Sequence, residues 1–168
     1  ELANIDPDVK IEAQKTEMPL TVWDANTQHN FHHAVDDCPN GNLAWSKDIP
    51  GVVETSSNLA IIKSENGTIT ISILSRSAVD AEMDKAAKAI GDVFKQNGAE
   101  VKHHGAYPGW KPNVHSAILE TMKEVYHKKF GKVPEVKVIH AGLECGILGA
   151  IYTHWDMVSF GPTIRYPH

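Results

Sequence analysis

The chain has 168 residues, 42% hydrophobic and 22% charged, which is enough apolar material for a folded core. It carries 16 Lys and Arg against 21 Asp and Glu, a net charge of −5 with no basic tract, so we expect no nucleic-acid partner. No apolar run reaches the roughly 18 residues of a membrane helix, so no membrane partner is expected. The N-terminus has neither an initiator Met nor a signal sequence, and the two cysteines are far apart. These features predict a piece of a longer cytoplasmic protein with reduced thiols.

The first part of the chain alternates between strand-like and helix-like patterns. Its clearest signal is Asn66-Gly67 between two β-rich runs, which indicates a hairpin turn with positive φ at both residues. The element order β-α-β-β-α-β predicts an α+β, ferredoxin-like unit with helices on one face of an antiparallel sheet. In chain order we expect a strand over 9–17, a helix over 27–38, strands over 59–65 and 68–74, a helix from the capping-box pattern at 77–80 to Gly98, and a strand over 100–106.

The two-residue turn also predicts the pairing of the hairpin, with partner residue numbers that sum to 133. In this register Arg76 lies at the far end of the hairpin, on the face away from the core. Its guanidinium is suited to bidentate binding of a carboxylate, and a surface ion pair is the alternative. The register also predicts one apolar, buried face: Ala60, Ile62, Ile69, Ile71 and Ile73.

A stretch rich in Gly and Pro, 105–112, marks a boundary after which the pattern changes. Alternating helices and short apolar strands follow, which is typical of a piece of a parallel α/β layer. The sequence therefore predicts two units, residues 1–106 and residues 107–168. Within the second unit we expect a helix from Asn113 to Gly131, a strand over 136–139, a short helix over 144–149 and a strand over 157–160.

Two other groups of polar residues are candidates for a site. His29, His32 and His33 have helical spacing, which suits either a metal or a solvated polar face, and we favour the polar face. Glu144 follows a predicted strand in a loop that contains glycines, where it could bind a cation or cap the next helix.

Several stretches together resemble a known family. The chain from Gly51 to His168 is similar to the C-terminal part of bacterial aminoacyl-histidine (Xaa-His) dipeptidases, which are co-catalytic zinc peptidases related to carnosinases and glutamate carboxypeptidases. The resemblance implies a parent enzyme in which residues 1–106 are part of a lid and dimerisation domain, and residues 107–168 are the C-terminal segment of a catalytic α/β domain. The matching stretches are Gly51-Val-Val-Glu-Thr-Ser56, Gly105-Ala-Tyr-Pro-Gly-Trp110, His140-Ala-Gly-Leu-Glu-Cys-Gly146, Asp156-Met-Val-Ser-Phe-Gly-Pro-Thr-Ile164 and Pro167-His168.

The resemblance also implies roles for individual residues. His168 resembles the last metal ligand of a site that holds two zinc ions in the parent enzyme. Arg76 resembles the lid arginine that binds the C-terminal carboxylate of the dipeptide substrate, and Glu144 resembles a position near the substrate's amino end. Asn58 resembles a lid asparagine that steadies the scissile carbonyl, although the predicted register puts Asn58 on the isoleucine face. A homodimer through the lid domain is implied as well.

The family's other zinc ligands, its general-base carboxylate and its lid histidine have no counterpart in these 168 residues. A catalytic zinc needs about three protein ligands and an open position, which a single terminal His does not supply. We therefore expect the parent protein to be a zinc-dependent Xaa-His dipeptidase and the isolated chain to be inactive. The alternative is a non-catalytic module that dimerises or binds a carboxylate.

Overall fold

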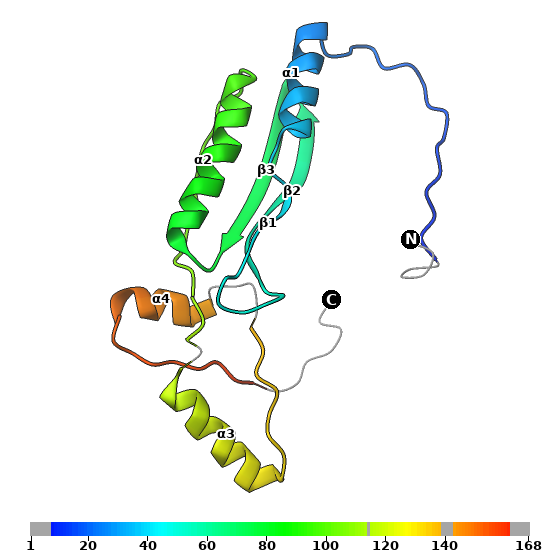
Figure 1. Cartoon of the computed structure of the whole chain (residues 1–168). Helices are drawn as coiled ribbons and strands as arrows, with labels where there is room; N and C mark the ends of the chain where they lie inside the picture. Colours follow the sequence, from blue (N-terminus) through cyan, green and yellow to red (C-terminus); the bar gives the residue numbers. More distant parts are fainter. Residues whose placement is uncertain (1–7, 114, 139–142, 162–168) are drawn as a thin grey trace.

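A computed structural model describes residues 8–113, 115–138 and 143–161 of the chain. Figure 1 shows two parts: a twisted sheet with two helices beside it, and two further helices beyond the end of the sheet. We call the first part the sheet unit and residues 113–161 the C-terminal segment. The sheet unit contains α1 (Ala25–Asp36), β1 (Gly41–Trp45), β2 (Val53–Glu65), β3 (Thr68–Ser77) and α2 (Asp80–Gln96), and the C-terminal segment contains α3 (Ala117–Phe130) and α4 (Leu143–Ile151).

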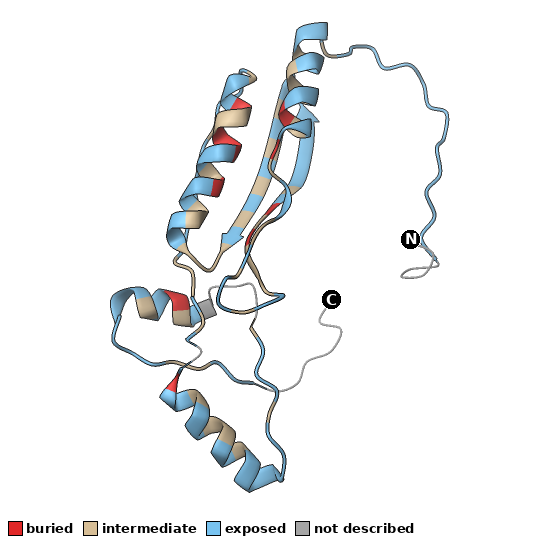
Figure 2. Cartoon of the chain, in the orientation of Figure 1, coloured by how far each residue is buried: buried red, intermediate tan, exposed pale blue. Residues whose placement is uncertain are grey.

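The three strands form one antiparallel sheet in the order β1-β2-β3. Residues of both α1 and α2 pack against the same face of this sheet, which confirms the predicted α+β class. The four predicted helices all form, with ends shifted by a few residues. The small core between helices and sheet is shown in red in Figure 2: Ala34, Cys38, Ile90 and Phe94 are buried, and Leu59, Ile71, Ile73 and Val101 pack around them.

The strands predicted outside the hairpin are wrong. Residues 9–17, 100–106 and 157–160 belong to no strand, and the sheet instead contains β1, which the sequence did not predict. Residues 136–138 are likewise outside any strand, and Ile139 is not among the described residues. Alternation of apolar residues indicates a strand only where a partner edge is present, and Ile11 is 87% exposed. The sheet therefore lacks the two outer strands of the predicted β-α-β-β-α-β order.

The predicted hairpin turn is confirmed, and its two central residues have φ of 51° at Asn66 and 74° at Gly67. The pairing follows the predicted register from this turn back to Ile61, which lies opposite Ser72. A β-bulge at Ala60 then shifts the register by one residue, so that Leu59 lies opposite Ile73.

The bulge lies where the side chain of Asn40 meets β2. Its Oδ1 accepts a hydrogen bond of 2.8 Å from the backbone N–H of Leu59, just before β1 begins. Because a shift of one residue exchanges the two faces of a strand, Leu59 turns into the core and Asn58 turns out of it. The expectation that Asn58 lies on the isoleucine face is therefore wrong.

The helix ends are set by local polar contacts. Ser77 does not form the predicted capping box: its Oγ accepts a bond of 3.1 Å from Val79 N, and the N-cap of α2 has no side-chain hydrogen bond. The α3 helix begins after Ser116 rather than at Asn113, because the Ser116 hydroxyl accepts from Leu119 N, and it ends at Gly131 with φ 72°. None of the described helices is long and apolar enough to cross a membrane.

Candidate substrate-binding site

Four side chains, three polar and one apolar, share one face of the sheet where β2 begins and β3 ends. Ser56 lies opposite Arg76, and Asn58 lies opposite Leu74, in the antiparallel ladder of β2 and β3. Since opposed residues, and residues two apart on one strand, point to the same side of a sheet, these four share a face. It is the face turned away from the packed helices, because Leu59 and Ile73 point to the core. We call Ser56, Asn58, Leu74 and Arg76 the open face.

The predicted position of Arg76 off the core face is thereby confirmed, and the bulge adds Asn58 beside it. Both side chains are exposed. The two residues are diagonal neighbours across the ladder, a relation that places Cα atoms about 7–8 Å apart, within reach of a long side chain. A guanidinium donates in a planar fork that matches a carboxylate, and an amide both donates and accepts. The pair can therefore bind a carboxylate and a neighbouring carbonyl group of one small molecule.

The backbone beneath Arg76 is held by hydroxyl groups on the opposite face. Thr55 Oγ1 and Ser77 Oγ are 2.9 Å apart, and the Ser75 hydroxyl lies 3.5 Å from that of Ser57. Thr55 and Ser57 are only 3% and 4% exposed. Such cross-strand contacts pair β2 with β3 at the very residues that flank Arg76, so its strand end is fixed although its side chain is exposed.

Glu144 belongs to a different element. It lies in the first turn of α4 with its side chain exposed, followed by half-buried Cys145 and buried Gly146. An acidic residue in a first turn interacts favourably with the helix dipole, so the predicted helix-terminal role and the predicted binding role both stay compatible with its position.

The predicted metal ligand His168 lies outside the described residues. Among the residues that are described, no group of three His, Cys, Asp or Glu side chains could hold a metal ion. His29 and His33 contact each other with ring centroids 4.3 Å apart, and His32 contacts Phe31, which agrees with the polar-face interpretation. Both cysteines are free thiols, and burial raises the pKa of Cys38. The described part of the chain therefore holds no complete zinc site of its own.

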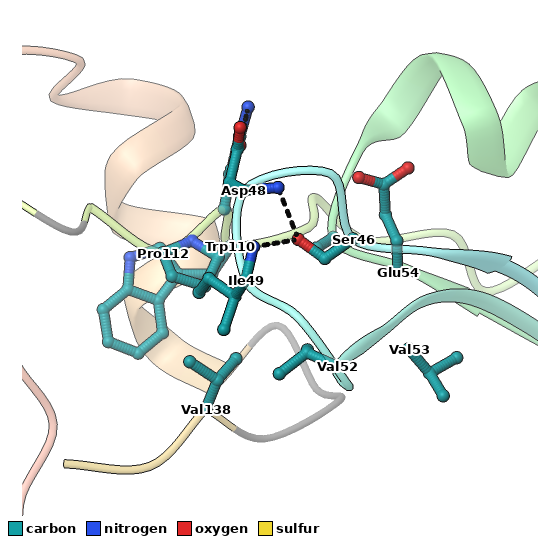
Figure 3. Close-up of a pocket in the computed structure, with 11 residues that line it drawn as sticks. Ser46, Asp48, Ile49, Val52, Val53, Glu54, Trp110, Pro112 and Val138 are labelled. Atoms are coloured by element: carbon teal, nitrogen blue, oxygen red, sulfur yellow. Dashed lines mark hydrogen bonds and ion pairs between the residues drawn. The ribbon is translucent and has the colours of Figure 1, made fainter.

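A set of contacts that the sequence did not predict lies where the sheet unit meets the residues after it. Lys111 Nζ lies 2.7 Å from Asp48 Oδ2, and this hydrogen bond raises the pKa of Lys111. Beside the pair is a cavity of about 20 Å³, shown in Figure 3, with Trp110 and Val138 in its lining. That volume holds roughly one water molecule, so the cavity is too small for a peptide. Only the Gly and Pro content of 105–112 marked this place in the sequence.

Comparisons with known proteins agree with the resemblance found in the sequence. The cytosol non-specific dipeptidase of Escherichia coli (strain K12) is 38% identical over 144 residues, which are 86% of this chain and 30% of that protein. The crystal structure of aminoacylhistidine dipeptidase from Vibrio alginolyticus matches with a TM-score of 0.86 and 38% identity, covering 99% of this chain and 34% of that one. No family model matches the chain.

The predicted resemblance to aminoacyl-histidine dipeptidases is therefore confirmed, and the chain is homologous to part of such an enzyme. It spans about a third of the length of both relatives. Both relatives are dipeptidases by name. The division at residues 106 and 107 stays a prediction.

Proposed function

We propose that this chain supplies substrate-binding residues to a zinc-dependent dipeptidase that hydrolyses Xaa-His peptides. The observation that carries the proposal is the open face, where the bulge at Ala60 brings Asn58 to the same side as Arg76. In this assignment Arg76 binds the C-terminal carboxylate of the dipeptide, Asn58 bonds the scissile carbonyl, and Glu144 lies toward the amino end. A peptide residue spans at most about 3.6 Å, so one side-chain pair can contact both the carboxylate and the preceding carbonyl.

The zinc ions belong to the proposal for the whole protein. His168 is the one residue of this chain that we assign to a metal, and the remaining ligands would come from parts of the protein outside these residues. When bound, the metal would supply an activated water for attack on the peptide carbonyl. The chain's own part is to hold the peptide in place, so we propose that the 168 residues alone have no peptidase activity. The name of the Escherichia coli relative and the two free thiols support a cytoplasmic location.

The test is steady-state kinetics with Xaa-His dipeptides, using the full-length protein that carries this chain. Arg76→Ala removes charge-assisted hydrogen bonds worth about 1.5–3 kcal/mol, so we expect KM to rise roughly 10- to 150-fold. Arg76→Lys keeps the charge without the planar fork and should recover only part of this loss. Lys63→Ala is the matched control, because Lys63 is an exposed cation on the same face of β2, near the hairpin turn.

The outcomes separate the two classes of function. Hydrolysis by the full-length protein with an unchanged KM in Arg76→Ala would refute the role of Arg76. A full-length protein that binds dipeptides but hydrolyses none would support the alternative, a non-catalytic carboxylate-binding module. Hydrolysis by the 168-residue chain alone would refute its proposed inactivity.

We also propose that the sheet unit pairs with a second copy of the chain. The support is the half of the hairpin nearer the turn, away from Arg76, where Ile61 and Ile62 are 49% and 43% exposed, and the position of β3 at the edge of the described sheet. Light scattering should give twice the 18.5 kDa mass of the chain, and Ile61→Lys should shift it toward the monomer. At about 100 μM the chain is far more concentrated than a micromolar Kd, so an unmodified chain that is monomeric at that concentration would refute the pairing.

A further inference from the structure

The residues that join the sheet unit to the C-terminal segment lie in close backbone contact with the end of β3 and with α4. A methyl group added to Gly109 would lie 2.7 Å from the carbonyl oxygen of Ser77 and 2.8 Å from the carbonyl carbon of Ala78. A methyl group added to Gly146, in α4, would lie 2.6 Å from the carbonyl oxygen of Pro108. All these neighbours are backbone atoms, which cannot move aside as a flexible side chain does. We call residues 107–112 the linker.

Further contacts hold the linker in this place. The backbone N–H of Gly109 donates a hydrogen bond of 2.8 Å to Asp80 Oδ1 at the start of α2. Two residues later Lys111 forms its ion pair with Asp48, in the loop between β1 and β2. Figure 3 shows Trp110 beside that loop, around a cavity no larger than one water molecule. The linker is therefore clamped to the sheet unit at successive residues rather than free to swing.

The clamp connects the two ends of the proposed substrate site. Ser77, which touches Gly109, directly follows Arg76 at the end of β3. Gly146, which touches Pro108, lies two residues after Glu144 in α4. The backbone of the linker thus lies between the strand end that carries Arg76 and the helix turn that carries Glu144. In Figure 1 the carboxyl end of β3 points toward α4.

We propose that Gly109 and Gly146 are positioning residues that set the span between Arg76 and Glu144 and thereby select peptides of two residues. The inference rests on the proposed function, in which Arg76 and Glu144 bind opposite ends of the substrate. Neither glycine has a positive φ, so alanine is allowed by the backbone at both positions and only the contact distance excludes it. A methyl carbon in ordinary contact lies about 3.4 Å or more from a neighbouring atom. In the alanine variants the linker must therefore move away from the end of β3, or α4 away from the linker, by roughly 0.7 Å or more.

A wider span has a predictable effect on substrate choice. Misplacement of binding groups by about 1 Å can cost up to roughly 100-fold in rate, because the substrate no longer meets both ends at once. A tripeptide is longer by one residue and loses less from the same widening. Gly109→Ala and Gly146→Ala should therefore raise the dipeptide KM about tenfold or more, and shift the ratio of tripeptide to dipeptide kcat/KM about tenfold toward the tripeptide.

The experiment measures that ratio in the full-length protein, with an Xaa-His dipeptide and a tripeptide that ends in the same Xaa-His. Gly149→Ala is the matched control in the same helix, since its methyl group would meet only the mobile end of Met157, at 3.1 Å from Cε. It should leave the ratio unchanged. A role of the glycines in stability alone would lower both activities together and would not move the ratio.

A second pair of variants adds no atoms to the contact. Asp80→Ala removes the acceptor of the Gly109 N–H and frees the linker, whereas Asp80→Asn keeps an acceptor oxygen at that place. The ratio of tripeptide to dipeptide kcat/KM should shift in the alanine variant and not in the asparagine variant. If the glycine variants fail to fold, this pair alone tests whether the linker contact sets the ratio. An active unmodified protein whose ratio none of these variants changes would overturn the inference. An unmodified protein without dipeptidase activity would instead refute the proposed function.

Discussion

The sheet unit and the C-terminal segment both contain helices, yet among the described residues only the sheet unit has a hydrophobic core. In α2, Ile90 and Phe94 are each 7% exposed and pack toward the sheet. In α3 no residue is buried, and Val125 is 56% exposed. Figure 2 shows the same contrast, with buried residues along α1 and α2 and none along α3. Within the described residues, an amphipathic helix is buried only where the chain also supplies the sheet that covers its apolar face.

The contrast predicts unequal costs for removing apolar side chains. Phe94→Ala empties part of the only hydrophobic core among the described residues, so we expect the free energy of unfolding to fall by about 3–5 kcal/mol. Val125→Ala removes a side chain that is already in water, and we expect a change within about 0.5 kcal/mol. Urea unfolding of the 168-residue chain, followed by circular dichroism, measures both.

Equal losses in the two variants would contradict this view, because they would mean that α3 is packed against something in solution. A second copy of the chain is the partner to examine in that case, by repeating the unfolding over a range of protein concentrations. A midpoint that rises with concentration would show that association covers the apolar face of α3.

Local signals in the sequence predicted much of both parts. Asn66-Gly67 gave the hairpin because few residue pairs accept positive φ twice, and Gly131 ended α3 for the same reason. The resemblance assigned a binding role to Arg76, and the pattern of the hairpin put it on the correct face. These features depend on residues that are neighbours in sequence.

Features that depend on distant residues were missed. The bulge at Ala60 lies where Asn40, 19 residues away from Leu59, bonds the backbone of β2, and it reverses the face on which Asn58 lies. The contact between Gly109 and Ser77 likewise joins segments that meet only in the fold. A strand such as 9–17 cannot be judged from its own residues, because its ladder needs a partner edge. The face on which Asn58 lies and the contact of Gly109 with Ser77 could therefore be found only from the structure.

Within its described residues, the C-terminal segment has a polar tie in place of a hydrophobic core. Asp156 Oδ2 accepts a bond of 3.0 Å from the backbone N–H of Ile118, in the first turn of α3. Asn113 Nδ2 lies 3.4 Å from Asp156 Oδ1. The bond from Ile118 N–H, together with bonds from Ser116 and its neighbours, lowers the pKa of Asp156 below its ordinary value of 3.8. An ionised carboxylate therefore links the chain near residue 156 to the start of α3.

The smallest expected effect concerns the pH dependence of this tie. A carboxyl group whose pKa is lower in the folded state stabilises that state above its ordinary pKa, and the contribution is lost as pH falls through the folded value. Below pH 3.8 we expect the Ile118 amide to lose hydrogen-exchange protection, while Phe94 amide protection persists to lower pH. Asp156→Asn should reduce Ile118 protection at neutral pH and remove its pH dependence, and Asp84→Asn, an exposed acid of α2, should change neither. Identical pH profiles for Ile118 and Phe94 would mean that the two parts unfold as one unit, so that the core, rather than the Asp156 tie, limits the stability of both.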